Sequence, residues 1–393
     1  MRHLSLLAVL ACCAVAATPA AQTQSAAPTT RSPTPIFRLS VSLVQLDAVV
    51  SDRKGNPVTT LNADDFLVLQ DGKSQKVTAA SYVDMGESWV DSSGLPPLPA
   101  EALRPTDARR IVAIVVDDSR MSMESVNAAR IGLLKFADRE FQPGDLAMLI
   151  TTSGGYRRAP ELTYSRFVLR SSIGRLRFSL DSVRPGSVFD PVSSLADFDG
   201  AYDSFQERNF SVSALERVAA AVELLRPLPG RKSVVLVSEG FSIFGYGMDT
   251  SIVRDAMQRL VDNSNRAGVV IYALDPRGLV VTGLTAADAA SPRANGGASV
   301  PDRRLAALRD SQDGLRYMAD ETGGFAVVNS NDLSRGLGRI MADQRGYYLI
   351  GYQPEAGTLA ADSSGRFRHV KIKVKQKGLH VRTRSGFYAV ASE

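Results

Sequence analysis

Short apolar runs that alternate with helical patterns constrain the fold of this chain more than any other feature. The runs are RIVAIVV, LAMLITT, SVVLVSEG, VVIYALD and FAVV. Continuous apolar runs of this length are typical of strands that are buried on both faces of a sheet. Helical periodicity follows the first run, because Val126, Ala129, Leu133 and Phe136 recur on one face. The alternation predicts βαβ units, with a mostly parallel sheet and helices on both of its faces.

Two β-rich segments flank this α/β domain, which we assign to residues 109–345. Residues 37–84 contain two apolar runs around a DG turn, a pattern typical of a hairpin. Residues 346–393 contain HVKIKVK, whose alternation predicts a strand with one buried and one solvated face. Because neither segment has many strands of its own, we expect the two to form a small β-sandwich with the α/β domain inserted between them.

The N-terminus predicts an exported protein. Residues 1–21 have a positive start, an apolar centre and a small-residue end, as cleaved signal peptides do, and residues 22–36 form a polar leader. Cys12 and Cys13 both lie in the signal, so the mature chain would have no disulfide; lipid attachment at Cys12 is the alternative. No later run has the about 20 apolar residues of a membrane-spanning helix. We expect a periplasmic or extracellular location.

Two further segments are predicted to lack regular structure. Residues 85–108 are rich in Pro, Gly and Ser, which indicates a linker between the first β segment and the α/β domain. Residues 280–302 are rich in Ala, Gly and Ser, which indicates a mobile insertion inside the α/β domain.

The charge distribution argues against a nucleic-acid partner. One predicted strand is nevertheless strongly basic. The 393 residues carry a formal net charge of only +5, and no basic cluster is interleaved with stacking aromatics. Lys371, Lys373 and Lys375 lie in a stretch that has no acid from residue 365 to residue 392. They predict either the solvated face of a strand or a binding patch for an acidic partner or an envelope surface.

Acids and hydroxyls follow the predicted strands in a pattern that suggests a ligand site. Asp117, Asp118, Ser119 and Ser122 come directly after the first strand, and Glu239 follows a later one. Because parallel strands end at the same edge, we expect Asp117 and Glu239 to share a solvent-reachable hollow. Oxygen ligands of this kind suit Mg²⁺ or Ca²⁺. The alternative is a helix N-terminus that is capped and stabilised by these residues, without a metal.

The ordered motifs VVDDSRMS, LAMLITTSGG, PGRKSVVLVSEG, VIYALDPRGL, ETGG and NDLSRGLGRI resemble a von Willebrand factor A (VWA) domain. With the leading β segment and the closing GYYLIGYQP, the chain is similar to the VWFA-related proteins predicted as secreted in acidobacteria. The resemblance implies a Rossmann-like domain with a metal-ion-dependent adhesion site. In that site an Asp-x-Ser-x-Ser motif, a Thr and a further Asp hold a divalent cation, and a carboxylate of the protein ligand completes the shell.

Carried over residue by residue, the resemblance implies a degenerate site. Asp117 and Ser119 match the first two positions, whereas the third falls on Met121, which cannot ligate, and Ser122 is one residue late. The Thr is sought in RNFSVSAL, which offers Asn209 and Ser211 instead. Glu239 replaces the further Asp. The implied metal ligands are therefore Asp117, Ser119, Ser122 and Glu239, with Asp118, Asn209 and Ser211 as additional candidates.

Catalytic motifs are not found in the sequence. His369 and His380 lie in the β-rich tail, away from the serines of the α/β domain, so a Ser-His-Asp hydrolase is not expected. We expect an exported, non-enzymatic protein-interaction or adhesion module with an unidentified protein ligand and an undetermined oligomeric state. The alternative is a structural or assembly component of the cell envelope that makes metal-independent contacts through the basic tail.

Overall fold

The computed structural model describes residues 44–85, 110–154, 160–178, 200–243, 250–283, 300–354 and 367–388. The chain divides into two units, residues 1–41 and 42–393, and every described residue belongs to the second. The expected signal, the leader, nearly all of the linker and most of the insertion lie outside the described residues. Within the described part, no helix combines the length and the apolar character that a membrane crossing requires.

The centre of the fold is a five-stranded parallel sheet, as the alternation of apolar runs predicts. Every residue of its central strand is buried, because helices cover both faces. The sheet has the order β5-β4-β6-β7-β8, and each neighbouring pair is parallel. The strands are β4 (Arg110–Val116), β5 (Asp145–Thr151), β6 (Lys232–Val237), β7 (Val269–Leu274) and β8 (Ala326–Val327).

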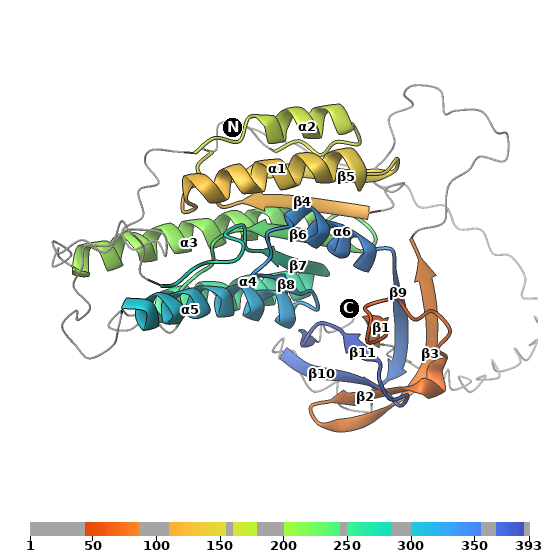
Figure 1. The fold of residues 1–393 in the computed structure, drawn as a ribbon. Coiled ribbons are helices and arrows are strands. Elements are labelled where there is room, and N and C mark those ends of the chain that lie inside the picture. Colours follow the sequence, from red (N-terminus) through yellow and green to blue (C-terminus); the bar gives the residue numbers. More distant parts are fainter. Residues whose placement is uncertain are drawn as a thin grey trace, which may run out of the picture. The chain divides into compact units, whose positions relative to one another are not determined.

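Six helices of the described chain cover the two faces of this sheet (Figure 1). One face packs against α1 (Met123–Arg139), α2 (Arg166–Gly174) and α6 (Leu333–Asp343). The other face packs against α3 (Gly200–Leu225), α4 (Ser251–Ala267) and α5 (Val300–Glu321). The predicted mixed α/β architecture is therefore confirmed.

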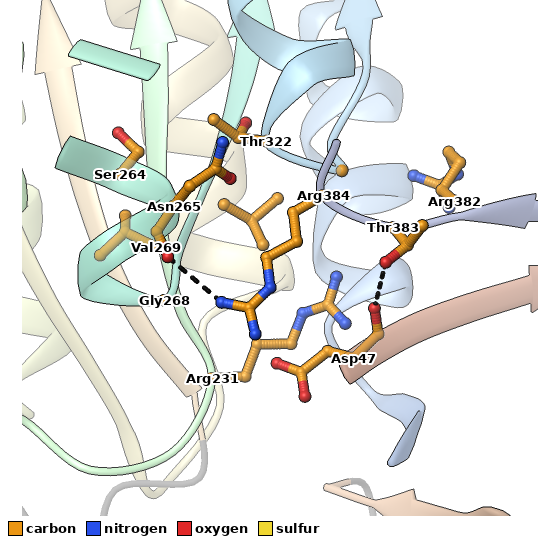
Figure 2. A pocket seen from close by; sticks show the side chains of 12 residues that line it. Asp47, Arg231, Ser264, Asn265, Gly268, Val269, Thr322, Arg382, Thr383 and Arg384 are labelled. Carbon is orange, nitrogen blue, oxygen red and sulfur yellow. Dashed lines mark hydrogen bonds between the residues drawn. The ribbon is translucent and has the colours of Figure 1, made fainter. Parts of the chain in front are cut away.

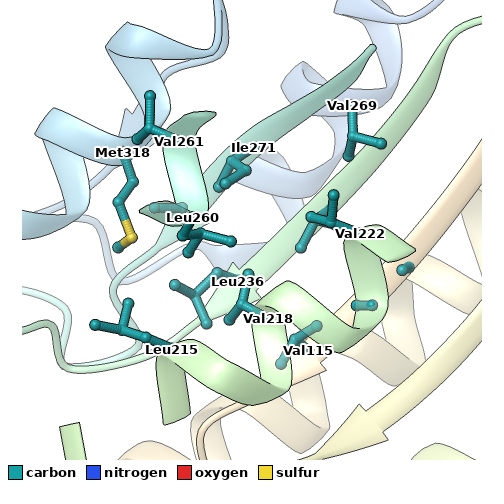
Figure 3. Close-up of a cluster of buried hydrophobic side chains, with 14 of the residues drawn as sticks. Val115, Leu215, Val218, Val222, Leu236, Leu260, Val261, Val269, Ile271 and Met318 are labelled. Atoms are coloured by element: carbon teal, nitrogen blue, oxygen red, sulfur yellow. The ribbon is translucent and has the colours of Figure 1, made fainter. Parts of the chain in front are cut away.

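The side chains of one sheet face show why the chain is held in this arrangement (Figure 3). Val115, Leu236 and Ile271 project from three neighbouring strands and are fully buried. Val218 of α3 and Leu260 of α4 pack against them. Burial of each such aliphatic side chain contributes about 1.5–3 kcal/mol, so this layer fixes the helices on which the loops at the strand ends depend.

A second sheet is antiparallel and contains both terminal β segments. Its order is β11-β1-β9-β3-β2-β10-β12, so strands from the two ends of the chain are interleaved in space. Its strands are β1 (Val44–Ser51), β2 (Phe66–Gln70), β3 (Lys73–Asp84), β9 (Gly346–Gln353), β10 (Phe367–Val374), β11 (His380–Arg382) and β12 (Gly386–Tyr388), and a 3₁₀ turn, η1 (Ala63–Asp65), precedes β2.

The described strands form one curled sheet where we expected a β-sandwich. Leu46, Val68, Tyr348 and Ile372 project from four of its strands into a single buried cluster. A register shift between β3 and β9, of the kind a β-bulge makes, increases the local bend. Because the sheet curls around its own apolar face, it needs no second sheet to cover that face.

Asp343 joins the two sheets at the end of α6. It accepts a hydrogen bond from the hydroxyl of Tyr272 in β7 at 2.6 Å. Burial, followed by the charge of Asp343, raises the pKa of Tyr272, so this hydroxyl stays protonated and donates. Arg382 of β11 donates to the same carboxylate at 3.1 Å, and Arg231 lies 3.9 Å away. One buried acid thus connects α6, the parallel sheet and the antiparallel sheet.

Further contacts beside Asp343 place this junction at the amino ends of the parallel strands (Figure 2). Arg384 donates to the carbonyl of Asn265, just before β7, at 3.2 Å. Thr383 donates to the carbonyl of Asp47 in β1 at 2.9 Å. A hollow of about 20 Å³ remains between them, which has room for about one water molecule. The carboxyl ends of the strands, where the candidate site lies, form the opposite edge of the sheet.

Asp343→Ala is expected to lower the free energy of unfolding by about 3–5 kcal/mol, because it leaves buried Arg231 and the hydroxyl of Tyr272 without this acceptor. Urea unfolding followed by circular dichroism measures the loss. Asp138→Ala is the control, since its ion pair with Arg170 is about half exposed, and its unfolding midpoint should barely move. Equal midpoints for both variants would contradict the junction described here.

Candidate functional site

The order of the parallel strands creates a crevice at their carboxyl ends. From β4 the chain passes through α1 to β5 on one side, then returns through α3 on the opposite face to β6 on the other side. The strand order reverses between β4 and β6, and ligands of open α/β sheets bind at such a switch point. Asp117 follows β4 and Glu239 follows β6, so both acids lie at this point.

Asp117 is a fully buried acid of the crevice. Its backbone N–H continues the β4–β6 ladder by donating to the carbonyl of Val237 at 2.9 Å, which fixes where the side chain starts. Its Oδ2 accepts from the hydroxyl of Ser238 at 2.7 Å, and its Oδ1 accepts from Thr152 at 3.1 Å. The side chain has 0 % exposure. A buried carboxylate requires such partners, because an unpaired buried charge is very costly.

Arg120 brings a buried positive charge to the same carboxylate. Its Nη1 lies 3.6 Å from Oδ2 of Asp117 and donates to the carbonyl of Gly240 at 3.0 Å. Its Nη2 lies 3.5 Å from a carboxylate oxygen of Glu207 in α3, and the guanidinium carbon is 4.8 Å from the ring centroid of Phe241. Arg120 is therefore a resident cation between two acids, enclosed by an aromatic ring.

Gly240 permits this close approach. Its φ is +95°, a left-handed conformation that glycine adopts at little cost. A Cβ at this position would lie 2.1 Å from the carbonyl oxygen of Ser311 in α5. The turn after β6 therefore requires glycine, and this turn presents the carbonyl that Arg120 contacts.

Hydroxyl groups tie the loop after β4 to the loop after β5. The hydroxyl oxygens of Ser119 and Thr152 are 2.8 Å apart, and the backbone N–H of Ser119 donates to Thr152 at 3.1 Å. Asp118 accepts from the backbone N–H of Ser153 at 2.8 Å and also from its hydroxyl. Each acid of the Asp117-Asp118 pair thus has partners in the neighbouring loop.

Ser122 caps α1, which supports the capping interpretation of this motif. Its hydroxyl accepts from the backbone N–H of Ser125 at 3.2 Å, as an N-cap does. Its own backbone N–H donates to Oε1 of Glu239 at 2.8 Å. Met121, which precedes it, is buried in the core beneath α1 and has 1 % exposure. Glu239 therefore binds the first turn of a helix, where its charge is favourable.

The structure brings five of the predicted residues to one edge and separates the others. Asp117, Asp118, Ser119, Ser122 and Glu239 are linked by the contacts above. Both expected carboxylates of the shared hollow are enclosed, since Asp117 has 0 % and Glu239 has 1 % exposure. They are therefore not solvent-reachable: Arg120 and hydroxyl groups surround Asp117, and Glu239 accepts from the backbone of Ser122.

The remaining predicted residues lie elsewhere. On α3, Asn209 is exposed and Ser211 is buried with 2 % exposure. Lys371, Lys373 and Lys375 are exposed on and just after β10, while Val370 and Ile372 between them are buried, as the alternation predicts. β10 has neighbours on both sides, β2 and β12, so its lysines cover a face of the antiparallel sheet.

Sequence reasoning missed Thr152, Ser153, Ser238, Glu207 and Arg120. A signal for the first two was present, because TTS follows the apolar run LAMLI just as DDS follows RIVAIVV. Parallel neighbours end at the same edge, so hydroxyls after β5 had to face acids after β4. Nothing in the sequence indicates that Arg120 turns inward, since an Arg beside a helix start is more often solvated.

The residues do not fit a resident divalent cation. Asp117, Ser119 and Thr152 present oxygens near one another, but Ser122 caps α1 and Glu239 accepts from a backbone N–H. Within the described ranges, no group of three or more acids, histidines or cysteines could hold a metal ion. Hard cations need six or more oxygen ligands, and the guanidinium of Arg120 stands at the carboxylate that would supply the main charge.

At a third strand end, an acid is again paired with an arginine of the same chain. Asp275 follows β7 and has 1 % exposure. Arg277 pairs with it at 2.8 Å, and the amide of Gln312 in α5 donates to it at 2.9 Å. The acids at the carboxyl edge of the sheet are thus each held by a group of the chain itself, which makes this edge rigid.

Comparisons with known proteins give no family for the chain. No family model matches it, and no curated protein matches it. Among solved structures it is similar to an aerotolerance-related membrane protein from Bacteroides fragilis NCTC 9343, at 14 % identity and a TM-score of 0.32, covering 59 % of this chain and 98 % of that one. It is also similar to the conserved hypothetical protein BatB from Bacteroides thetaiotaomicron, at 11 % identity and a TM-score of 0.27, covering 60 % and 98 %.

A third similar structure is the N-terminal domain of TFIIH p34, at 12 % identity and a TM-score of 0.24, covering 61 % of this chain and 99 % of that one. All three TM-scores are low, so the description of this site depends on its own geometry alone.

Asp117→Ala is expected to lower the free energy of unfolding by about 3–5 kcal/mol, because Arg120 stays buried without its carboxylate. The double variant with Arg120→Met should recover much of this loss, since no unpaired guanidinium is then buried and the carboxylate of Glu207, 20 % exposed, can be hydrated. Urea unfolding of the wild type, both single variants and the double variant gives the coupling energy. Simply additive losses would show that Asp117 and Arg120 do not depend on each other.

Proposed function

We propose that this protein is an exported, non-enzymatic interaction module related to VWA domains, and that the carboxyl edge of its parallel sheet binds a partner protein. The VWA relation is supported by the ordered motifs at the strand ends and by the α/β architecture. Export is supported by the signal-like residues 1–21. The acids at the switch point fix the loops that form the binding edge.

Exposed apolar side chains at this edge are the observation that carries the proposal. Met123, directly after the cap of α1, is 61 % exposed. Leu279 and Val281, in the segment that follows β7, are 67 % and 76 % exposed. The backbone N–H of Leu279 donates to the side chain of Asn331 at 2.8 Å, so this segment is held in place. We infer that these side chains belong to one contiguous apolar patch, because contiguous exposed apolar patches mark protein-binding surfaces.

The polar groups of the edge are arranged to support this surface. Ser119 and Ser238 are each within hydrogen-bonding distance of the carboxylate of Asp117, and both described histidines belong to the antiparallel sheet. A hydrolytic serine needs a base that accepts its proton and then donates this proton to the leaving group. We therefore propose binding without catalysis.

Metal independence is part of the proposal. We infer that Arg120 supplies, from within the chain, the positive charge that a divalent cation supplies in the adhesion site implied by the sequence resemblance. The guanidinium is enclosed between Asp117, Glu207 and Phe241, so it is a permanent component of the site. The sequence predicts that Mg²⁺ or Ca²⁺ binds at Asp117, whereas we propose that Arg120 takes the place of the cation. A metal titration distinguishes the two.

A metal titration is expected to show no saturable heat and no change of melting temperature when millimolar Mg²⁺, Ca²⁺ or Mn²⁺ is added to the wild type. Arg120→Ala should lower the melting temperature, and Mn²⁺ should restore part of it, because the freed carboxylates then attract a cation. Calorimetry and thermal unfolding give both readouts. Saturable metal binding by the wild type would contradict the arginine-based site.

The basic face of β10 is the alternative contact surface, because Lys371, Lys373 and Lys375 are exposed side by side. An envelope component could bind an acidic partner there without using the carboxyl edge. The two proposals require different residues, so one set of variants separates them.

Affinity capture from an extract of the source organism is expected to recover a partner with the wild type and to lose it with Met123→Glu/Leu279→Asp. Leu224→Glu is the control, because Leu224 is 43 % exposed at the far end of α3. Lys371→Glu/Lys373→Glu/Lys375→Glu should leave the recovery unchanged. If only the lysine variant loses the partner, the basic face is the binding surface and the carboxyl edge is not.

A further inference from the structure

The outer edge of β5 is nearly unpaired in the described chain. β5 is the first strand of the parallel sheet, so β4 is its only strand neighbour among the described residues. On the outer side a single antiparallel bridge joins Ala147 to Thr163, with hydrogen bonds of 3.0 and 2.8 Å. No described strand continues this pairing toward the carboxyl end of β5.

The ladder shows which backbone groups face outward. Thr152 donates to the carbonyl of Val116 in β4 at 3.0 Å, so the even-numbered residues of this strand point toward β4. Ala147 pairs on the opposite side, as strand alternation requires. The N–H and C=O groups of Leu149 and Thr151 therefore point to the outer side, and both residues are half-buried. An edge of this kind is a template for another strand.

A cavity of about 480 Å³ lies along this edge. One wall is the β5 segment from Leu149 to Thr151, and the other contains Val168 and Leu169 of α2. Ser153 lies at the end near the candidate site, and Thr163 of the bridge also lines the cavity. A volume of this size accommodates several residues of an extended peptide, with backbone donors and acceptors on one side and apolar side chains on the other.

Arginines give the cavity an excess of positive charge. Arg175 and Arg177, after α2, are exposed, and Arg217 of α3 is held by a hydrogen bond of 2.7 Å from its Nη2 to the carbonyl of Gly154. Arg175 also hydrogen-bonds the hydroxyls of two serines, which do not neutralise its charge. The acids of the lining are Glu161 and Asp118, so three arginines stand against two carboxylates.

We propose that this groove binds an extended acidic segment of a partner protein, which adds to the parallel sheet as a further strand beside β5. The backbone groups of Leu149 and Thr151 supply the pairing, and Arg175 and Arg177 bind carboxylates of the added strand. The site is separate from the apolar carboxyl edge, sharing with the crevice only the Asp118–Ser153 contact. It therefore stands even if that edge binds nothing.

The test uses a fluorescein-labelled peptide of eight alternating Val and Glu residues, with a Val–Lys peptide of equal length as its control. Fluorescence anisotropy with the full mature chain should show saturable binding of the Val–Glu peptide only. Arg175→Glu/Arg177→Glu should weaken this binding by about tenfold or more, because attraction becomes repulsion. Arg226→Glu/Arg259→Glu, with the same charge change on other helices, and Met123→Glu at the carboxyl edge should leave it unchanged.

Two further measurements address the backbone. Thr151→Pro removes an outward N–H without removing a β4–β5 bond, since proline is tolerated where the N–H faces away from the sheet, and it should abolish binding. Hydrogen exchange on the wild type is independent of how this variant folds. The amides of Leu149 and Thr151 should exchange more slowly once the peptide is bound.

Five outcomes would overturn the proposal, and the first four concern the peptides and dimerisation. The Val–Glu peptide could fail to bind, or the Val–Lys peptide could bind equally well. The Val–Glu peptide could bind without protecting the amides of Leu149 and Thr151. The chain could also form a dimer that protects β5 before peptide is added. The last outcome would make a second copy of this chain the occupant. Protection of both amides in a monomer without peptide would show that the chain itself covers the edge, and it too would overturn the proposal.

Discussion

The buried carboxylate of Asp117 is the interaction on which the carboxyl edge of the parallel sheet depends. It stands at the end of β4 with 0 % exposure, so its charge must be met by groups of the chain itself. Those groups come from the loop after β5, the loop after β6 and the residue Arg120. Arg120 in turn reaches Glu207 of α3. The contacts of this one acid therefore connect four elements that are distant in the sequence: the loops after β4, β5 and β6, and α3.

The sequence was sufficient for the parallel sheet because every one of its strands is a continuous apolar run between polar turns. It was also sufficient to place Asp117 and Glu239 at one edge, since parallel strands share a direction. It did not show that Arg120 would be the neighbour of Asp117, because the direction of a long side chain in a loop depends on tertiary contacts such as Phe241. Thr152 was overlooked because the resemblance directed the search to a different segment.

The antiparallel sheet shows another limit of pattern analysis. Alternation in HVKIKVK correctly separates the buried Val370 and Ile372 from the exposed lysines. The same alternation is compatible with two packed sheets or with one sheet that curls, since both bury a single face of each strand. The number of sheets depends on which strands pair, and that pairing crosses almost the whole chain. No local pattern contains this information.

The interleaving of terminal strands determines when this protein can begin to fold. β1, β2 and β3 are made first, yet β1 and β3 each lie against β9, and β2 lies against β10. β2 and β3 can pair with each other early, but β1 and the outer edges of this hairpin need nearly the entire polypeptide, so folding intermediates present unpaired, aggregation-prone backbone. A chain that ends before β9 could not form a complete antiparallel sheet. The native topology therefore requires the last fifty residues or so.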